Sequence, residues 1–105
     1  MYKVIFSRYA EMDINDIILY YNDINPTYAV ALLEAFEKRV SELDLYPNRG
    51  RIVPELEREN IIAYRELIEG NYRIIYSIIE DRVEVHAIID ARRNLEDILI
   101  KKLMH

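Results

Sequence analysis

Arginine is the residue type in this chain best suited to chemistry, and most of the positive charge lies in the second half. Ten of the fourteen lysines and arginines follow Asn48. A guanidinium group binds phosphate bidentately and stabilises charge that develops on a transferred phosphoryl group. A single arginine more often forms an ordinary ion pair, so only a local cluster would indicate a phosphate site. The arginines that could form one are Arg49, Arg51, Arg65, Arg73, Arg82, Arg92 and Arg93.

Few other side chains offer proton transfer or metal binding. His86 is the only internal histidine, and it is either a general acid or base or an ordinary strand histidine. The chain has no cysteine and no metal-ligand spacing, so we expect neither a metal nor another cofactor. Asp90, followed by Arg92 and Arg93, could meet Arg73 or a phosphate, or form a salt bridge at the end of a strand.

Length and composition limit the class of protein. A chain of 105 residues with 51% hydrophobic and 31% charged residues predicts one folded domain over residues 1–105. The net charge of −5 is not that of a general nucleic-acid binder. The sequence lacks a signal-peptide pattern and a long apolar run, so we expect a cytoplasmic protein with no membrane partner.

The first half predicts a strand and two helices. Tyr2–Ser7 alternates like a short strand, and apolar residues at helical spacing follow from Ala10. This helix stops before Asn25, which can cap a second helix that begins at Pro26 and ends before Pro47. The short connection favours an antiparallel helical hairpin.

The second half predicts a loop over Pro47–Asn60, three strands, and a short helix from Asn94 to Leu103. The strands are Ile61–Glu69, Tyr72–Ile79 and Val83–Asp90, the first two joined by a tight turn at Gly70-Asn71. The predicted class is therefore α+β, ordered β-α-α-β-β-β with a short C-terminal helix, and with the helical hairpin packed on an antiparallel sheet. The position of the first strand in the sheet stays open.

The tight turn also predicts which residues share a face of the sheet. The expected core face carries Arg65, Leu67, Tyr72, Ile74, Tyr76 and Ile78, continued by Val83, Val85, Ala87 and Ile89. The other face is mixed in polarity and carries Tyr64, Glu66, Ile68, Arg73, Ile75, Ser77 and Ile79, continued by Glu84, His86, Ile88 and Asp90. Either the C-terminal helix covers its isoleucines or the face is a groove for a partner. Tyr64 is the only tyrosine that this register places beside arginine on the mixed face, where a base could stack.

Several short motifs carry a family resemblance. They are Pro47, Asn48-Arg49-Gly50-Arg51, Val53-Pro54-Glu55, Tyr64-Arg65-Glu66-Leu67, Tyr72-Arg73-Ile74-Ile75-Tyr76 and Ile89-Asp90-Ala91-Arg92-Arg93. In this combination and order, nearly the whole chain resembles the RelE/ParE superfamily of bacterial type II toxins. The resemblance implies a stand-alone toxin of the plasmid stabilisation type that is silenced by a cognate antitoxin. A groove on the mixed sheet face would fit such a partner, with Tyr64, Glu66, Ser77, His86, Asp90 and Arg92 as expected binding residues.

The superfamily divides by target: RelE-like members cleave mRNA in the 70S ribosome, whereas ParE-like members inhibit DNA gyrase. The resemblance implies that Arg73, Arg93 and Arg65 would be the catalytic residues if this chain were RelE-like. However, Leu67 and Leu99 stand where the nucleases carry a lysine and a tyrosine, so proton transfer would fall to His86 or another tyrosine. The sequence therefore favours a ParE-like inhibitor. A RelE-like nuclease is the alternative, and a non-toxic module that only binds antitoxin is the second alternative.

The predicted faces also give each arginine an expected environment. Arg73 and Arg93 lie at strand or loop positions that we expect to be exposed. The assumed register points Arg65 toward the core, where a reversed charge would threaten stability.

Overall fold

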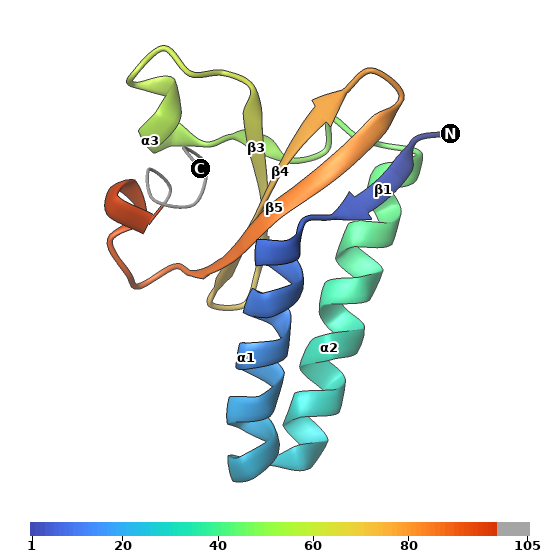
Figure 1. The fold of residues 1–105 in the computed structure, drawn as a ribbon, viewed down its shortest axis with the longest axis vertical. Coiled ribbons are helices and arrows are strands. Elements are labelled where there is room, and N and C mark those ends of the chain that lie inside the picture. Colours follow the sequence, from blue (N-terminus) through green and yellow to red (C-terminus); the bar gives the residue numbers. More distant parts are fainter. Residues whose placement is uncertain (99–105) are drawn as a thin grey trace.

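The computed structural model describes residues 1–98 of the chain (Figure 1). Its first half contains β1 (Lys3–Phe6), α1 (Arg8–Ile24) and α2 (Pro26–Ser41), followed by a 3-10 turn over Glu42–Asp44. Its second half contains β2 (Arg51–Ile52), α3 (Pro54–Glu57), β3 (Tyr64–Glu69), β4 (Tyr72–Ile79) and β5 (Arg82–Asp90). Residues 95–98 are helical. None of the helices within residues 1–98 is long and apolar enough to cross a membrane.

The five strands form one mixed sheet in the order β1-β5-β4-β3-β2. The strands β2 to β5 pair antiparallel, whereas β1 runs parallel to β5 at the opposite edge. The predicted α+β class and the antiparallel pairing of β3, β4 and β5 are confirmed. The structure also gives the position of the first strand, which the sequence left open: β1 lies beside β5, with Val4 paired with Val83.

Side-chain caps fix the helical hairpin. The Ser7 hydroxyl accepts a hydrogen bond from the Ala10 amide at 3.1 Å and so begins α1. Asn25 lies between the two helices, and its side chain accepts a hydrogen bond from the Tyr28 amide while Pro26 occupies the first turn of α2. The hairpin packs on one face of the sheet, and its far end extends beyond the sheet (Figure 1).

The sheet is covered on both faces. Between the helical hairpin and the sheet lies the larger core, which includes Phe36, Val40, Ile74 and Val83. On the other face, Ile75, Ala87 and Ile89 pack against Val53 and Leu56 around α3 and against Leu95 and Ile98 of the last helical turn. Helix therefore covers Ile75, whereas Ile68, another isoleucine of the predicted mixed face, is 45% exposed. A partner groove elsewhere on this face stays a prediction.

A β-bulge corrects part of the predicted face assignment. The β3–β4 register is as expected, with Leu67 opposite Ile74. Between β4 and β5, however, Ile75 pairs with Ala87 and the next residue, Tyr76, pairs with Val85, so His86 is an extra residue. One extra residue moves all later side chains to the opposite face. As a result, Ala87 and Ile89 lie on the α3 side, and Ile88 and Asp90 lie on the hairpin side, contrary to prediction for all four.

The segment predicted as a loop over residues 47–60 also contains β2 and α3, which the sequence analysis missed. Both elements are too short to give a periodic signal. The strand expected from Ile61 begins only at Tyr64. The predicted C-terminal helix is observed over residues 95–98, and its remainder, up to Leu103, lies outside the described residues.

Candidate functional site

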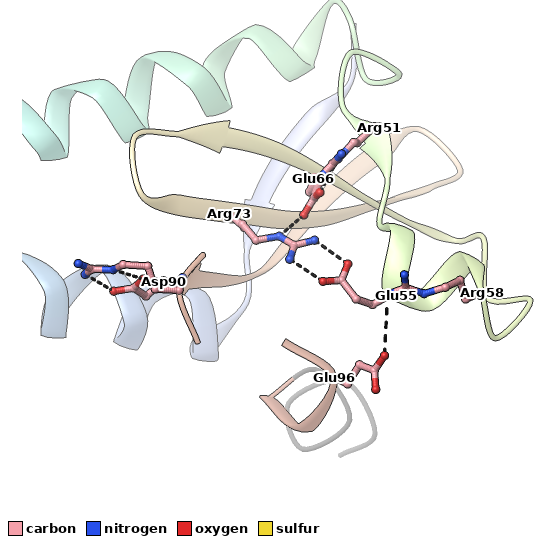
Figure 2. A network of polar contacts seen from close by, with 8 residues as sticks. Arg51, Glu55, Arg58, Glu66, Arg73, Asp90 and Glu96 are labelled. Carbon is pink, nitrogen blue, oxygen red and sulfur yellow. Dashed lines mark hydrogen bonds and ion pairs between the residues drawn. The ribbon is translucent and has the colours of Figure 1, made fainter. Parts of the chain in front are cut away.

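Arg73 lies at the centre of a buried ion-pair network built by four elements (Figure 2). From β4, its Nη1 and Nη2 donate to both carboxylate oxygens of Glu55 in α3, at 2.7 and 2.8 Å. Its Nε donates to Glu66 in β3 at 2.5 Å. The other oxygen of Glu66 accepts from the Nε of Arg51 in β2 at 2.6 Å. The network therefore joins α3 and the edge strand to the middle of the sheet.

The charges in this network balance one another. Burial by itself would lower the pKa of Arg73, but hydrogen bonds from Arg73 to Glu55 and Glu66 outweigh it and hold the pKa above its ordinary value. The hydrogen bond from Arg73 lowers the pKa of Glu55. Arg73 is only 8% exposed and Glu66 1%. The expectation that Arg73 is exposed is wrong, because α3 covers this part of the sheet and supplies a carboxylate to it.

The two other positions of the expected nuclease site in β3 also have structural partners. Arg65 lies opposite Tyr76, as the register predicted, and its Nη1 donates to the Gly50 carbonyl oxygen at 2.8 Å. Leu67 is buried in the core between sheet and hairpin. An aliphatic residue suits that environment, whereas a lysine there would bury a charge.

Tyr64, Ser77 and His86 form a second polar cluster on the α3 side. The Ser77 hydroxyl and His86 Nε2 lie 2.7 Å apart, and the Tyr64 ring packs edge-on against the His86 ring at a centroid distance of 5.3 Å. Burial lowers the pKa of His86 and so favours the neutral imidazole. A hydrogen-bonded serine and histidine could move a proton, although Ser77 is itself buried.

A third group surrounds a cavity of about 770 Å³ between α1 and the end of β5. Arg92 binds both carboxylate oxygens of Asp90 at 2.9 and 2.7 Å, and hydrogen bonds from Arg92 lower the Asp90 pKa to about 2. Arg93 is exposed, as expected, and lines the same cavity. Arg73, the other arginine that a RelE-like site would use, is not among the residues that line this cavity. Leu99 lies outside the described residues.

Apart from Arg65, which binds the Gly50 carbonyl oxygen, the structure divides the predicted site residues among three places. Glu66 and Arg73 lie in the ion-pair network, Tyr64, Ser77 and His86 in the second cluster, and Asp90, Arg92, Arg93 at the cavity. Glu55 is the partner that sequence reasoning missed, although it stood in the quoted Val53-Pro54-Glu55 motif. Within residues 1–98, no group of three or more acidic or histidine side chains is placed to hold a metal ion.

Comparison with known proteins agrees with this fold. A solved structure described as "Chromosomal ParDE TA system from P. aeruginosa" matches with a TM-score of 0.73 at 18% identity, over 88% of this chain and 98% of that chain. At this identity, the match establishes similarity of fold. No curated protein sequence matches the chain. A family model, described as ParE toxin of type II toxin-antitoxin system, parDE, matches residues 4–95. The chain therefore belongs to the ParE toxin family of type II toxin-antitoxin systems.

Proposed function

We propose that this chain arrests bacterial growth by binding DNA gyrase, and that a cognate antitoxin protein silences it. The match to the ParE toxin family supports this proposal. The similar solved structure is described as a toxin-antitoxin system, which supports an antitoxin as the partner. In this proposal the toxin acts by binding and needs neither a general base nor a cofactor.

The ion pairs of Arg73 with two carboxylates are the observation that favours gyrase inhibition over mRNA cleavage. A nuclease would need this guanidinium to stabilise charge on the scissile phosphate. In this chain its three nitrogens donate to Glu55 and Glu66. Phosphate binding would have to break these bonds, leaving Glu55 without this partner and Glu66 with Arg51 alone, at a cost on the order of 3 kcal/mol.

The RelE-like alternative would rest on the Tyr64, Ser77 and His86 cluster. Cleavage requires a base for the 2′-hydroxyl and an acid for the leaving oxygen, and these side chains are the candidates for both roles. The burial of Ser77 and the engagement of Arg73 by Glu55 and Glu66 both count against such a site.

The test is to express the chain under an inducible promoter in bacteria and then assay the purified protein on two targets. We expect growth arrest that is relieved when the neighbouring antitoxin is co-expressed. We expect the purified chain to inhibit gyrase supercoiling or to trap cleaved DNA, while ribosome-bound mRNA stays intact.

A pair of charge reversals tests the exposed arginine. Arg93→Glu should reduce toxicity at an unchanged melting temperature, because the side chain is exposed. Lys38→Glu, at an exposed position of α2, is the matched control and should leave toxicity as it is. Codon-positioned mRNA ends would instead establish the nuclease. Normal growth at confirmed soluble expression would leave only the antitoxin-binding module.

A further inference from the structure

The segment that carries α3, residues 54–63, makes its backbone hydrogen bonds within itself. Its two ends meet where the Val53 amide donates to the Tyr64 carbonyl oxygen at 3.0 Å. Within the described part of the chain, the backbone hydrogen bonds that residues 56–61 donate end on carbonyl oxygens of residues 53–57. A surface loop with close ends and its own internal contacts is a self-contained unit. Its backbone therefore does not depend on the sheet that it covers.

Glu55 and Leu56 attach this segment to the sheet. The Glu55 carboxylate accepts from both Nη1 and Nη2 of Arg73, at 2.7 and 2.8 Å (Figure 2). Leu56 is 8% exposed and packs in the second core. Beyond it, residues 57–63 are all exposed. The ion pair that Arg58 forms there spans 4.0 Å between exposed side chains, and such a pair adds little.

Opening of this segment leaves no buried charge without a partner. When Glu55 moves away, water hydrates its carboxylate, and Arg73 keeps the hydrogen bond from its Nε to Glu66. Glu66 also keeps its second partner, Arg51, and the pairing of β2 with β3 is untouched. The loss is confined to one bidentate ion pair and the apolar contacts of Leu56. A local opening of this size costs less free energy than global unfolding.

We propose that residues 54–63 form a lid that opens as a unit about a hinge at Val53 and Tyr64. The ion pair between Glu55 and Arg73 is its latch. The closed lid hides apolar residues of the sheet and occupies both terminal nitrogens of Arg73. An acidic group from elsewhere can bind these nitrogens only while the lid is open, so the latch is an autoinhibitory contact. This device goes beyond the proposed function and does not depend on the target of the toxin.

Thiol labelling tests the lid directly, because the chain has no cysteine of its own. Ala87→Cys places a single thiol in the second core, where Ala87 is fully buried in one cluster with Leu56. Ala10→Cys, at a fully buried position of the core between hairpin and sheet, is the matched control. We expect the thiol at position 87 to react about tenfold faster or more, and with a weaker dependence on urea. Opening of the lid exposes much less surface than global unfolding does.

Equal labelling rates with the same urea dependence would show that only global unfolding uncovers the second core, and would overturn the proposal. Ile75→Cys is a second reporter if Ala87→Cys does not fold. Ile75 is also fully buried in the second core, two residues from Arg73 on β4. Its thiol should show the same ratio to position 10.

Substitutions in α3 test the latch. In the Ala87→Cys background, Glu55→Gln should speed labelling about tenfold, because it removes the charge that Arg73 binds. Glu57→Gln changes an exposed carboxylate of the same helix and should alter the rate less than about twofold. An unchanged rate in Glu55→Gln would overturn the latch. So would acceleration by Leu95→Ala alone, because the turn at residues 95–98 would then be the cover that opens.

The same substitution at the control position separates a local effect from a global one. Glu55→Gln should speed labelling at position 87 by a larger factor than at position 10. Equal factors at both positions would mean that the ion pair stabilises the whole fold and latches no lid, which would overturn the proposal.

Discussion

Arg73 could bind a phosphate by its residue type, but its contacts in the structure give it a role in holding the fold together. Its guanidinium group bridges Glu55 and Glu66, and Glu66 in turn binds Arg51. Each group in this network is needed by the others, because an unpaired charge in a buried position is costly. The arginine is thus part of the fold, connecting the short helix α3 to the sheet.

Removing Arg73 should destabilise the protein strongly. Arg73→Ala leaves Glu55 without its guanidinium partner and the buried Glu66 with Arg51 alone. We expect a loss of about 3–5 kcal/mol in the free energy of unfolding, measured by denaturant titration at pH 7. Combining it with Glu66→Gln removes a buried charge that has lost one of its two arginine partners and should recover part of the loss. Arg58→Ala, at an exposed ion pair of 4.0 Å with Glu96, is the control and should change the stability by less than about 0.5 kcal/mol. A small effect of Arg73→Ala would contradict the structural role of this arginine.

Asp90 offers a second prediction for a single residue. Its pKa of about 2 depends first on the hydrogen bond from Arg92. Arg92→Ala should therefore raise the pKa toward the ordinary value of 3.8, as measured by a carboxyl NMR titration. Because the folded-state pKa is depressed, the stabilisation is complete above about pH 4 and is lost as the pH falls toward 2. Arg82→Ala, which breaks the pair with Glu84, should leave Asp90 unchanged, and a variant Asp90 still near 2 would exclude Arg92 as the cause.

The arginines of the candidate site could be identified from the sequence, but not all of the acidic residues that bind them. Arg73 and Glu66 were expected on one face of the sheet, and they are in contact there. Glu55 could not be assigned, since it lies on a helix of four residues inside a segment that reads as a loop. The burial of Arg73 depends on that contact with α3, so it could not be derived from the strand pattern.

Among the elements, the short strand β2 is positioned by one close approach. The Gly50 amide donates to the Tyr76 hydroxyl at 2.8 Å, and that hydroxyl donates to the Pro47 carbonyl oxygen at 2.7 Å. The Tyr76 side chain therefore holds the chain just before β2 against the centre of the sheet. A side chain at position 50 has no room, because a Cβ atom there would lie 2.7 Å from the Tyr76 hydroxyl oxygen and would also meet the Glu66 carbonyl oxygen.

Gly50→Ala should consequently displace β2 and lower stability by about 2 kcal/mol or more, as overpacking in a core does. The matched control is Gly70→Ala, where a Cβ atom meets nothing within 4 Å and only the positive φ of 58° opposes the change. We expect the control to cost about 1 kcal/mol. Thermal and denaturant unfolding of both variants would measure the difference, and equal losses would show that crowding at Gly50 is unimportant.

At the scale of elements, the pattern of the strands predicted part of the sheet register correctly and part of it wrongly. Alternation and the Gly70 turn correctly predicted the β3–β4 register and the faces of Val83 and Val85. The bulge at His86 then changed the faces of the last four residues of β5. The alternation of apolar and polar residues does not predict a bulge here, because Ala87, Ile88 and Ile89 are all apolar and suit either face. The Ser7 hydroxyl donates to the His86 carbonyl oxygen at 2.9 Å, so the distant start of α1 binds the bulged residue.

At the scale of the whole molecule, a single sheet separates two cores. The helical hairpin and its core were predictable because two long amphipathic helices follow each other with a clear cap between them. The second core was not, since its cover consists of α3 and one turn at residues 95–98. Short covering elements gain their stability from the face that they cover, and their own sequence gives little sign of it.

The pairing of β1 with β5 has a consequence for the order in which the molecule forms. Residues 3–6 find their partners only at residues 82–85, and the Lys3 amide binds the Asp81 carbonyl oxygen. A chain growing from its amino terminus can form the helical hairpin early, but its first strand must wait for nearly all of the remaining sequence. Such a distant contact is slow to form, because a long loop must close before it gains any hydrogen bonds. A ribosome-bound chain therefore cannot complete its sheet until residues 82–85 have been made and can pair with β1.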